Sequence, residues 1–404
     1  MVRRMRIGFA VLVALVGNSA APAQRVQFPT RLPASTPVQV AQRTAIDRNV
    51  EAISDPEPEP DRELSTTPQF TTGYPPLTVE APEVFLTEPC APTCTTAPCY
   101  VEPAPIEHRW QLYGDFLWIQ PRGIETTYAV PFDGPIAQGA TPVPIGPAGV
   151  VDSEWTPAFR VGGAWMPVSP TRIGVAYTRF ESNVTDAFGV NPPDVIRALV
   201  LHPGTDAADA DFLDAGAAYG IDFELIDAEY RSIFFRNRDY TIDYLVGARY
   251  SKLQQDFVGT FSNATTVEHL DTRIAFDGVG LRLGMEGERR AKHLRGLLLY
   301  GRASASLLAG KFRAHYAQND NIQGIVAQTN WHSERVVPLL EMELGIGWTG
   351  PAEHLRVSAG YMFNAWYNTV QTGEFIQAVR TADFVDLGDT LTFDGLVGRV
   401  ELRF

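Results

Sequence analysis

The stretch that decides the fold is the C-terminal segment Leu396-Val397-Gly398-Arg399-Val400-Glu401-Leu402-Arg403-Phe404. Its even-numbered positions are apolar, aromatic or glycine, whereas Arg399, Glu401 and Arg403 at odd-numbered positions are charged. A strict period of two is the pattern of a β-strand with one apolar face and one charged face. The segment ends, together with the chain, on the aromatic residue Phe404.

The same alternation recurs throughout the part of the chain that follows residue 108. In one segment Trp155, Phe159 and Trp165 share a face that excludes Arg160. Ten segments have this strand-like pattern: Trp110–Gln120, Ser153–Met166, Thr171–Phe180, Phe223–Phe235, Asp239–Leu253, Asp271–Glu286, Leu294–Arg313, Ser333–Trp348, Leu355–Tyr367 and Leu391–Phe404. They predict an all-β, antiparallel, up-and-down barrel of about 10–12 strands spanning residues 108–404.

The connections between these segments alternate in length. Four are short, namely 166–170, 236–238, 287–293 and 349–354, and five are long, namely 121–152, 181–222, 254–270, 314–332 and 368–390. Short turns at one end and long loops at the other are typical of transmembrane β-barrels. An even number of strands places both termini at the short-turn end, which we expect to be periplasmic.

Alternation alone does not say which face points outward, because a soluble ligand-binding barrel alternates too. Aromatic spacing favours the membrane: Trp155 and Trp165 share a face ten residues apart, as do Tyr240 and Tyr250. Ten tilted residues rise about 25 Å, the height of an outer-membrane apolar band with its aromatic girdles. With Trp348, these residues form the predicted girdle. An aspartate at mid-bilayer would cost on the order of 2 kcal/mol, so a register shift or bulge is expected near Asp277.

The N-terminal residues 1–23 have the features of a secretory signal peptide. Arg3, Arg4 and Arg6 precede a short apolar run, and Ala21-Pro22-Ala23 offers a small-x-small cleavage site. The run is too short for a membrane span, although an uncleaved anchor helix is the alternative. No other stretch approaches 18 uninterrupted apolar residues, which excludes a helical membrane protein.

Residues 24–107 are predicted to be a disordered, acidic periplasmic linker. Residues 25–107 hold 15 of the 30 prolines and carry 5 basic and 12 acidic residues, a net charge of −7. Dense proline and few apolar residues disfavour a packed core. The linker is a candidate for contact with the cell wall, and a tether without a partner is the alternative. It contains Cys90, Cys94 and Cys99, and their spacing does not choose between an internal disulfide, an intermolecular one and a metal site.

From Trp110 onward the chain resembles a known family. The residues that carry the resemblance are Gly114-Asp115-Phe116-Leu117-Trp118, Gly247-Ala248-Arg249-Tyr250, Phe276-Asp277-Gly278-Val279-Gly280-Leu281-Arg282, Pro338-Leu339-Leu340-Glu341-Met342-Glu343-Leu344-Gly345, Leu355-Arg356-Val357-Ser358-Ala359-Gly360-Tyr361 and the segment from Phe393 to Phe404. They are similar to the Legionella-type pore-forming major outer-membrane protein family, which is expanded in planctomycetes. The resemblance implies a barrel of the cell outer membrane with pore-forming activity, and it brings no catalytic residues. Phe404 is then the candidate insertion signal, read by the barrel-insertion machinery.

Parity assigns a set of charged residues to the lumen of the barrel. The candidates for a constriction are Arg160, Arg249, Arg282, Glu286, Arg302, Glu341, Glu343, Arg356, Arg399, Glu401 and Arg403. The alternative is a plug of ion pairs, because small barrels leave room only for side chains. Acidic loop residues are expected to form a vestibule that attracts cations, and the alternative is that they serve general solubility and divalent-ion bridging to neighbouring surface polymers. They are Asp186, Asp194, Asp206, Asp209, Asp211 and Asp214. Their spacing matches no calcium loop, so neither a metal nor another cofactor is expected.

These features predict a passive, cation-preferring pore for small solutes or ions. A non-conducting structural or adhesive anchor is the alternative, and a barrel enzyme is a weaker one, because His269, His315 and His332 near the loops match no catalytic motif. We therefore expect no enzymatic activity. A net charge of −14 excludes a typical nucleic-acid-binding protein. The expected partners are outer-membrane lipid, the insertion machinery and periplasmic chaperones.

Overall fold

The computed structural model describes residues 108–135, 142–168, 170–237, 239–292, 294, 296–350 and 353–404. The predicted signal peptide, the predicted linker and its three cysteines lie outside these ranges.

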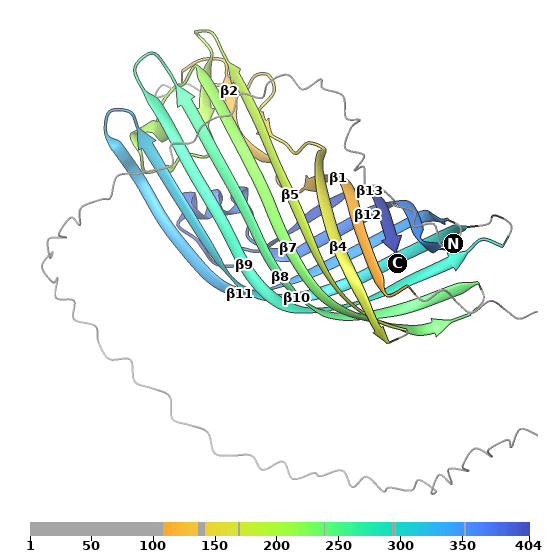
Figure 1. The fold of residues 1–404 in the computed structure, drawn as a ribbon. Coiled ribbons are helices and arrows are strands. Elements are labelled where there is room, and N and C mark those ends of the chain that lie inside the picture. Colours follow the sequence, from red (N-terminus) through yellow and green to blue (C-terminus); the bar gives the residue numbers. More distant parts are fainter. Residues whose placement is uncertain are drawn as a thin grey trace, which may run out of the picture. The chain divides into compact units, whose positions relative to one another are not determined.

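Ten antiparallel strands close into a barrel, which confirms the predicted fold class (Figure 1). In order around the wall they are β1 (Trp110–Arg122), β13 (Asp389–Arg403), β12 (Leu355–Thr369), β11 (Gly324–Thr349), β10 (Leu297–Asp320), β9 (Val267–Arg290), β8 (Tyr240–Ser262), β7 (Asp214–Arg236), β5 (Thr171–Gly189) and β4 (Thr156–Val168). Each of the ten predicted segments contains one of these strands or overlaps with it. The barrel closes where β1 pairs with β13 and Asp115 lies opposite Arg399.

Strands β7 to β11 are much longer than the sequence predicts. Each has 23 to 26 residues, whereas about 9–11 residues suffice to cross a bilayer. Two of the predicted long loops, 254–270 and 314–332, are therefore wrong. They consist mostly of strand, because β8 runs to Ser262, β9 begins at Val267, and only residues 321–323 separate β10 from β11.

The reason for this error is that the polarity of the two faces reverses along the strands. We call the short-turn end of the barrel its lower end and the opposite end its upper end. In the lower part of β8 the outward face carries Val246 and Tyr250, while Arg249 points inward and is buried. Further up, the outward face is polar and Leu253 and Phe257 are buried on the inward face. A strand surrounded by lipid must be apolar outside, whereas the same strand surrounded by water can place its apolar side chains inside.

Asp277 marks this reversal, and the predicted register shift near it is wrong. Pairing with both β8 and β10 runs through Asp277 without interruption. Its outward carboxylate pairs with Arg313 and accepts a hydrogen bond from the Tyr250 hydroxyl at 3.3 Å. The aspartate therefore lies at the upper edge of the apolar band, where a charge costs little.

Asp277 belongs to a row of alternating charges on six neighbouring strands, which we call the charged belt. From β5 to β11 the row reads Arg179, Glu224, Lys252, Asp277, Lys311 and Glu334. Each member lies opposite the next in the strand register, on the outward face. Opposite charges in directly facing positions stabilise a sheet modestly, and the belt separates the apolar outer surface from the polar one.

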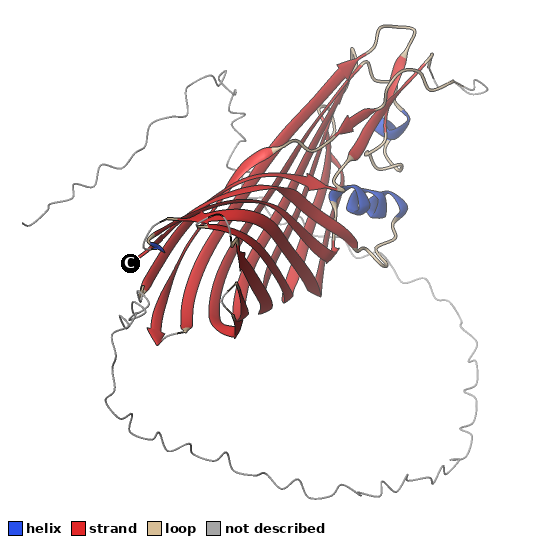
Figure 2. Cartoon of the chain, turned by 90° about the vertical axis from the view of Figure 1, so that its right-hand side faces the viewer, coloured by secondary structure: helices blue, strands red, loops and turns tan. Residues whose placement is uncertain are grey.

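Smaller elements occupy the long-strand end of the barrel (Figure 2). They are a three-stranded sheet of β3 (Gly149–Val151), β2 (Thr126–Phe132) and β6 (Val195–Ala198), a 3-10 turn η1 (Asp206–Asp209) and the helix α1 (Thr372–Thr381). Neither helical element in the described ranges is long and apolar enough to cross a membrane.

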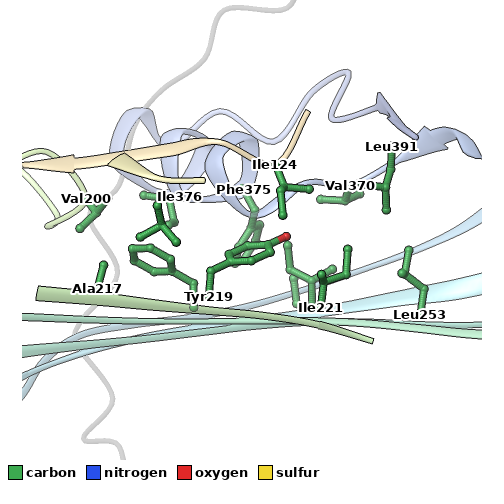
Figure 3. Packing of buried hydrophobic residues seen from close by; sticks show 14 of the residues in the cluster. Ile124, Val200, Ala217, Tyr219, Ile221, Leu253, Val370, Phe375, Ile376 and Leu391 are labelled. Carbon is green, nitrogen blue, oxygen red and sulfur yellow. The ribbon is translucent and has the colours of Figure 1, made fainter. Parts of the chain in front are cut away.

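Helix α1 packs against the inner face of the wall. Its residues Phe375 and Ile376 are fully or almost fully buried, and they face Tyr219 and Ile221 of β7 (Figure 3). The helix belongs to the connection between β12 and β13, which the sequence suggests is only a loop. Buried apolar side chains therefore occupy much of the upper half of the barrel.

Candidate functional site

The lower half of the lumen holds a layer of ion pairs. All eleven charged residues assigned to the lumen by parity lie on the inward face of their strands. Seven further inward charges complete the layer: Asp115, Arg172, Asp227, Glu229, Arg231, Asp243 and Glu288. The layer thus combines nine guanidinium groups with nine carboxylates. We call this set the ion-pair layer.

One part of the layer joins the first and last strands. Arg399 donates two hydrogen bonds to Asp115, both at 2.6 Å, and Arg160 of β4 approaches the same carboxylate at 3.3 Å. Asp115 is 3% exposed. A buried carboxylate stays charged only when it is paired and hydrogen-bonded. These contacts therefore hold the seam of the barrel closed.

A second part of the layer spans the lumen. Asp227 of β7 accepts two hydrogen bonds from Arg249, at 2.5 and 2.8 Å, and pairs with Arg282. The same two arginines contact Glu341 of β11 at 2.8 and 3.0 Å. Three strands lie between β7 and β11 around the shorter arc of the wall, so the arginines link nearly opposite sides of the barrel.

A small cavity lies within the layer beside Glu343. Glu343 of β11 lies 3.6 Å from Arg160 of β4 and 3.5 Å from Arg302, and it accepts a hydrogen bond from the Tyr300 hydroxyl at 2.8 Å. A cavity of about 50 Å³ lies between these groups, enough for a few water molecules. These charges pair with one another across the lumen, and their predicted role in a constriction stays a prediction.

Aromatic side chains close the lumen directly above the ion-pair layer. Phe223 of β7 contacts Trp366 of β12, with ring centroids 6.0 Å apart, although four strands separate them in either direction around the wall. Phe393 of β13 contacts Phe223 at 4.9 Å and Phe180 of β5 at 5.4 Å. All four rings are at most 1% exposed. We call Phe180, Phe223, Trp366 and Phe393 the aromatic bridge.

A buried polar contact fixes α1 above the aromatic bridge. Gln255 of β8 donates a hydrogen bond to the carbonyl oxygen of Val370 at 2.8 Å. Its side-chain oxygen accepts bonds from the Tyr219 hydroxyl at 2.9 Å and from Thr372 at 3.2 Å. Because all these groups are buried, separating them would leave unsatisfied polar atoms, and the helix is therefore well anchored to the wall.

The residues of the predicted acidic vestibule all come from one connection at the long-strand end and from the two strand segments that flank it. All six belong to the upper part of β5, the start of β7 or the connection between them. Asp186 accepts a hydrogen bond from the Tyr128 hydroxyl at 2.9 Å, and Asp209 pairs with Arg197 at 3.2 Å. Within the described ranges, no three His, Cys, Asp or Glu side chains are arranged to hold a metal ion.

Aromatic residues mark both edges of the apolar band. Trp165, Tyr240 and Trp348 lie near the short-turn end, and Trp155 and Tyr250 lie near the other edge; each is 40–44% exposed. Trp110 and Trp118 also face outward, at 51% and 39% exposure. Neither belongs to the predicted girdle, although both have the outward parity of β1. The Phe404 side chain is 56% exposed, and its carbonyl oxygen accepts bonds from the backbone N–H groups of Arg109 and Trp110.

A pair of carboxyl groups at the long-strand end was also missed. Glu268 of β9 and Asp320 of β10 lie opposite each other in the register and border a cavity of about 360 Å³. Burial and the neighbouring Asp320 carboxylate raise the pKa of Glu268 to about 7. Backbone N–H groups of Gln323 and Ile322 lower the pKa of Asp320. Because the pairing depends on strands expected to be loops, no sequence pattern indicated it.

A family model described as Legionella pneumophila major outer membrane protein precursor matches residues 103–396. No curated protein sequence matches. Among solved structures, the outer membrane protease OmpT of Escherichia coli is 10% identical, with a TM-score of 0.42 and coverage of 74% of this chain and 98% of that one. The Pseudomonas putida toluene transporter TodX is 8% identical (TM-score 0.21; 73% and 89% covered), and a Pseudomonas aeruginosa FadL homologue is 9% identical (TM-score 0.20; 74% and 90% covered).

The family match covers most of the chain and the entire barrel apart from the last residues of β13. It agrees with the closed ten-stranded barrel, the apolar band and the aromatic edges. The chain therefore belongs to the Legionella pneumophila major outer membrane protein family, and it is a β-barrel protein of the cell outer membrane.

Proposed function

We propose that this protein is a sealed outer-membrane anchor that presents an acidic structure at the cell surface. The observation that carries the proposal is the contact between Phe223 and Trp366, on opposite sides of the wall. The ion-pair layer lies below this contact, and α1 with its apolar surroundings lies above it. A solute would have to displace three successive obstructions.

The energy of these obstructions favours a sealed barrel over a gated one. Burying one large apolar side chain contributes about 1.5–3 kcal/mol, and the aromatic bridge alone has four. Breaking a buried ion pair by removing one partner costs about 3–5 kcal/mol. Opening the lumen would thus require a free energy comparable with the entire stability of a typical domain, about 5–15 kcal/mol.

A cation-preferring pore is the second candidate. It is favoured by the charged layer, by the small cavity next to Glu343, and by the acidic connection between β5 and β7. An acidic entrance concentrates cations. In this case the described conformation is a closed state, and conduction requires α1 and the aromatic bridge to move together.

Potassium efflux from proteoliposomes distinguishes the two candidates. The full chain, refolded into the vesicles and checked by its heat-modifiable mobility on gels, should release no more potassium than protein-free vesicles. A Phe223→Ala/Phe393→Ala variant removes half of the aromatic bridge, and Phe116→Ala/Phe159→Ala removes two outward rings as a matched control. Efflux through the wild-type protein would reject the anchor proposal and favour the pore.

We propose no catalytic role for the barrel. The three histidines considered from the sequence, His269, His315 and His332, lie on the outward faces of β9, β10 and β11. His269 contacts Thr260, and His315 contacts Asn330, so each points along a strand surface rather than into a cleft. Hydrolysis of a lipid or peptide that a single histidine substitution abolishes would overturn this part of the proposal.

We also propose that the partners of the barrel are outer-membrane lipid, periplasmic chaperones and the insertion machinery, with Phe404 as the insertion signal. The outward, half-exposed side chain of Phe404 at the end of the closing strand supports this role. Deleting Phe404 should lower the amount of assembled barrel in cells without changing refolding of the purified chain. Equal loss in both experiments would indicate a structural role instead.

A further inference from the structure

A basic cavity opens at the short-turn, periplasmic mouth of the barrel. Its volume is about 390 Å³. The charged residues in its lining are Arg109, Arg172, Arg236, Arg290, Arg403, Glu288 and Glu353. Five guanidinium groups against two carboxylates give the lining a net charge of +3, whereas the whole chain has a net charge of −14.

Three of the five arginines already have acidic partners. Arg172 lies 3.8 Å from Asp243, Arg290 lies 3.2 Å from Glu353, and Arg403 lies 2.5 Å from Glu401. The lining carboxylate Glu288 pairs with Arg356. In the part of the chain that the structure describes, Arg109 and Arg236 form no ion pair. The cavity therefore has two guanidinium groups left over, and both are exposed.

The backbone holds these two arginines in fixed positions. The N–H of Arg109 donates to the carbonyl oxygen of Phe404 at 3.0 Å, and its carbonyl oxygen accepts from Met166 at 2.9 Å. Arg236 is the last residue of β7 and lies opposite Thr241 of β8 in the register. These main-chain contacts fix the point at which each side chain leaves the wall of the barrel.

The cavity borders the membrane interface. Trp110, Trp165 and Tyr240 contribute to its lining and are 41–51% exposed on the outward face. The rings of Trp110 and Trp165 lie 6.2 Å apart. Tryptophan and tyrosine prefer the headgroup level of a bilayer, so this level is where the basic cavity opens.

We propose that this cavity binds a phosphate group, held mainly by Arg109 and Arg236. The guanidinium fork matches a phosphate with two parallel hydrogen bonds and is less hydrated than an ammonium group. The phosphate belongs either to a lipid headgroup of the inner leaflet or to a soluble periplasmic anion, and the chemistry of recognition is the same. The proposal is independent of whether the lumen conducts.

The test measures thermal unfolding of the full chain in a nonionic detergent, with inorganic phosphate or dioleoyl phosphatidate added at constant ionic strength. Phosphate-bearing ligand should raise the unfolding temperature of the wild-type protein. The Arg109→Gln/Arg236→Gln variant should bind it at least about tenfold more weakly, the loss expected for charge-assisted hydrogen bonds. Arg289→Gln is the matched control, because Arg289 is exposed on the outward face at the same end and does not line the cavity.

A shift with phosphatidate alone identifies a lipid ligand, and a shift with inorganic phosphate, with or without one for phosphatidate, shows that the phosphate group alone is sufficient; either result supports the site. No shift with either probe overturns the proposal, as does an equal shift in the double variant. The single variant Arg236→Gln provides an independent comparison if the double variant refolds poorly. Since both arginines are exposed, neither substitution should affect folding.

Discussion

Phe393 of β13 contacts Phe180 of β5 across the lumen, with ring centroids 5.4 Å apart in an edge-to-face arrangement. Two strands, β1 and β4, lie between them in the wall. The contact therefore bridges the interior instead of following the sheet, and it makes the barrel a packed structure rather than a tube.

Replacing Phe393 with alanine should lower the free energy of unfolding by about 3–5 kcal/mol, the cost of removing a fully buried aromatic ring. A double-mutant cycle with Phe180→Ala should give a coupling energy of about 0.5–1.5 kcal/mol. Phe159→Ala is the matched control, because this ring faces outward at 44% exposure. Urea titration of the refolded barrel measures the unfolding free energies of the wild type, the two single variants, the double variant and the control. A coupling energy of zero would mean that the two rings do not touch.

Replacing Asp227 with asparagine should destabilise the barrel by about 3–5 kcal/mol, because it leaves Arg249 buried with one partner fewer. Glu224→Gln, three residues earlier on the same strand, should change stability by no more than about 1 kcal/mol. Its pair with Arg179 is outward and partly exposed, at 29% and 43% for the two side chains. The same urea titration compares them, and similar effects of the two substitutions would show that the layer is hydrated and open.

Placing an arginine on the outward face should be costly below the charged belt and nearly neutral above it. Leu283→Arg lies within the apolar band and should lower the unfolding free energy in lipid vesicles by about 2–4 kcal/mol. Gln254→Arg, directly above Lys252 of the belt, should lower it by about 0–1 kcal/mol. Equal costs would place the edge of the membrane elsewhere along the strands.

Stability should depend on the protonation of Glu268. Its pKa is raised from an ordinary value of 4.5 to about 7 by burial and by Asp320, so the folded state binds this proton more tightly than the unfolded state. The contribution of Glu268 is present below pH 4.5 and is lost as the pH rises toward 7. Glu268→Gln should remove this dependence, while Glu154→Gln, at an exposed site, should retain it. Unfolding midpoints between pH 4.5 and 8 provide the measurement, and an identical pH profile for wild type and Glu268→Gln would contradict it.

The transmembrane part of the fold could be predicted because lipid outside and charge inside impose a period of two on each strand. The closing strand illustrates this, since Leu396, Val400 and Leu402 face outward and Arg399 and Glu401 are buried. The same parity placed all eleven lumen candidates on the inward face. Their role as a constriction stays a prediction.

The upper half of the barrel could not be predicted in the same way. There the outward face meets water and the inward face is apolar, so residues such as Asp277 interrupt the expected pattern and suggest loops or bulges. Contacts across the lumen, such as Phe223 with Trp366, join strands that are distant in sequence. No local pattern encodes them, because they depend on the number of strands and on how the barrel closes.

The central claim, that the lumen is sealed, is tested most directly by planar-bilayer conductance of the refolded full chain in a gradient of potassium chloride. The account predicts a membrane with no discrete current steps above background, although gel mobility shows that the barrel is folded. Discrete current steps with a reversal potential shifted toward the equilibrium potential of potassium would contradict it, and they would establish a cation-preferring pore in its place.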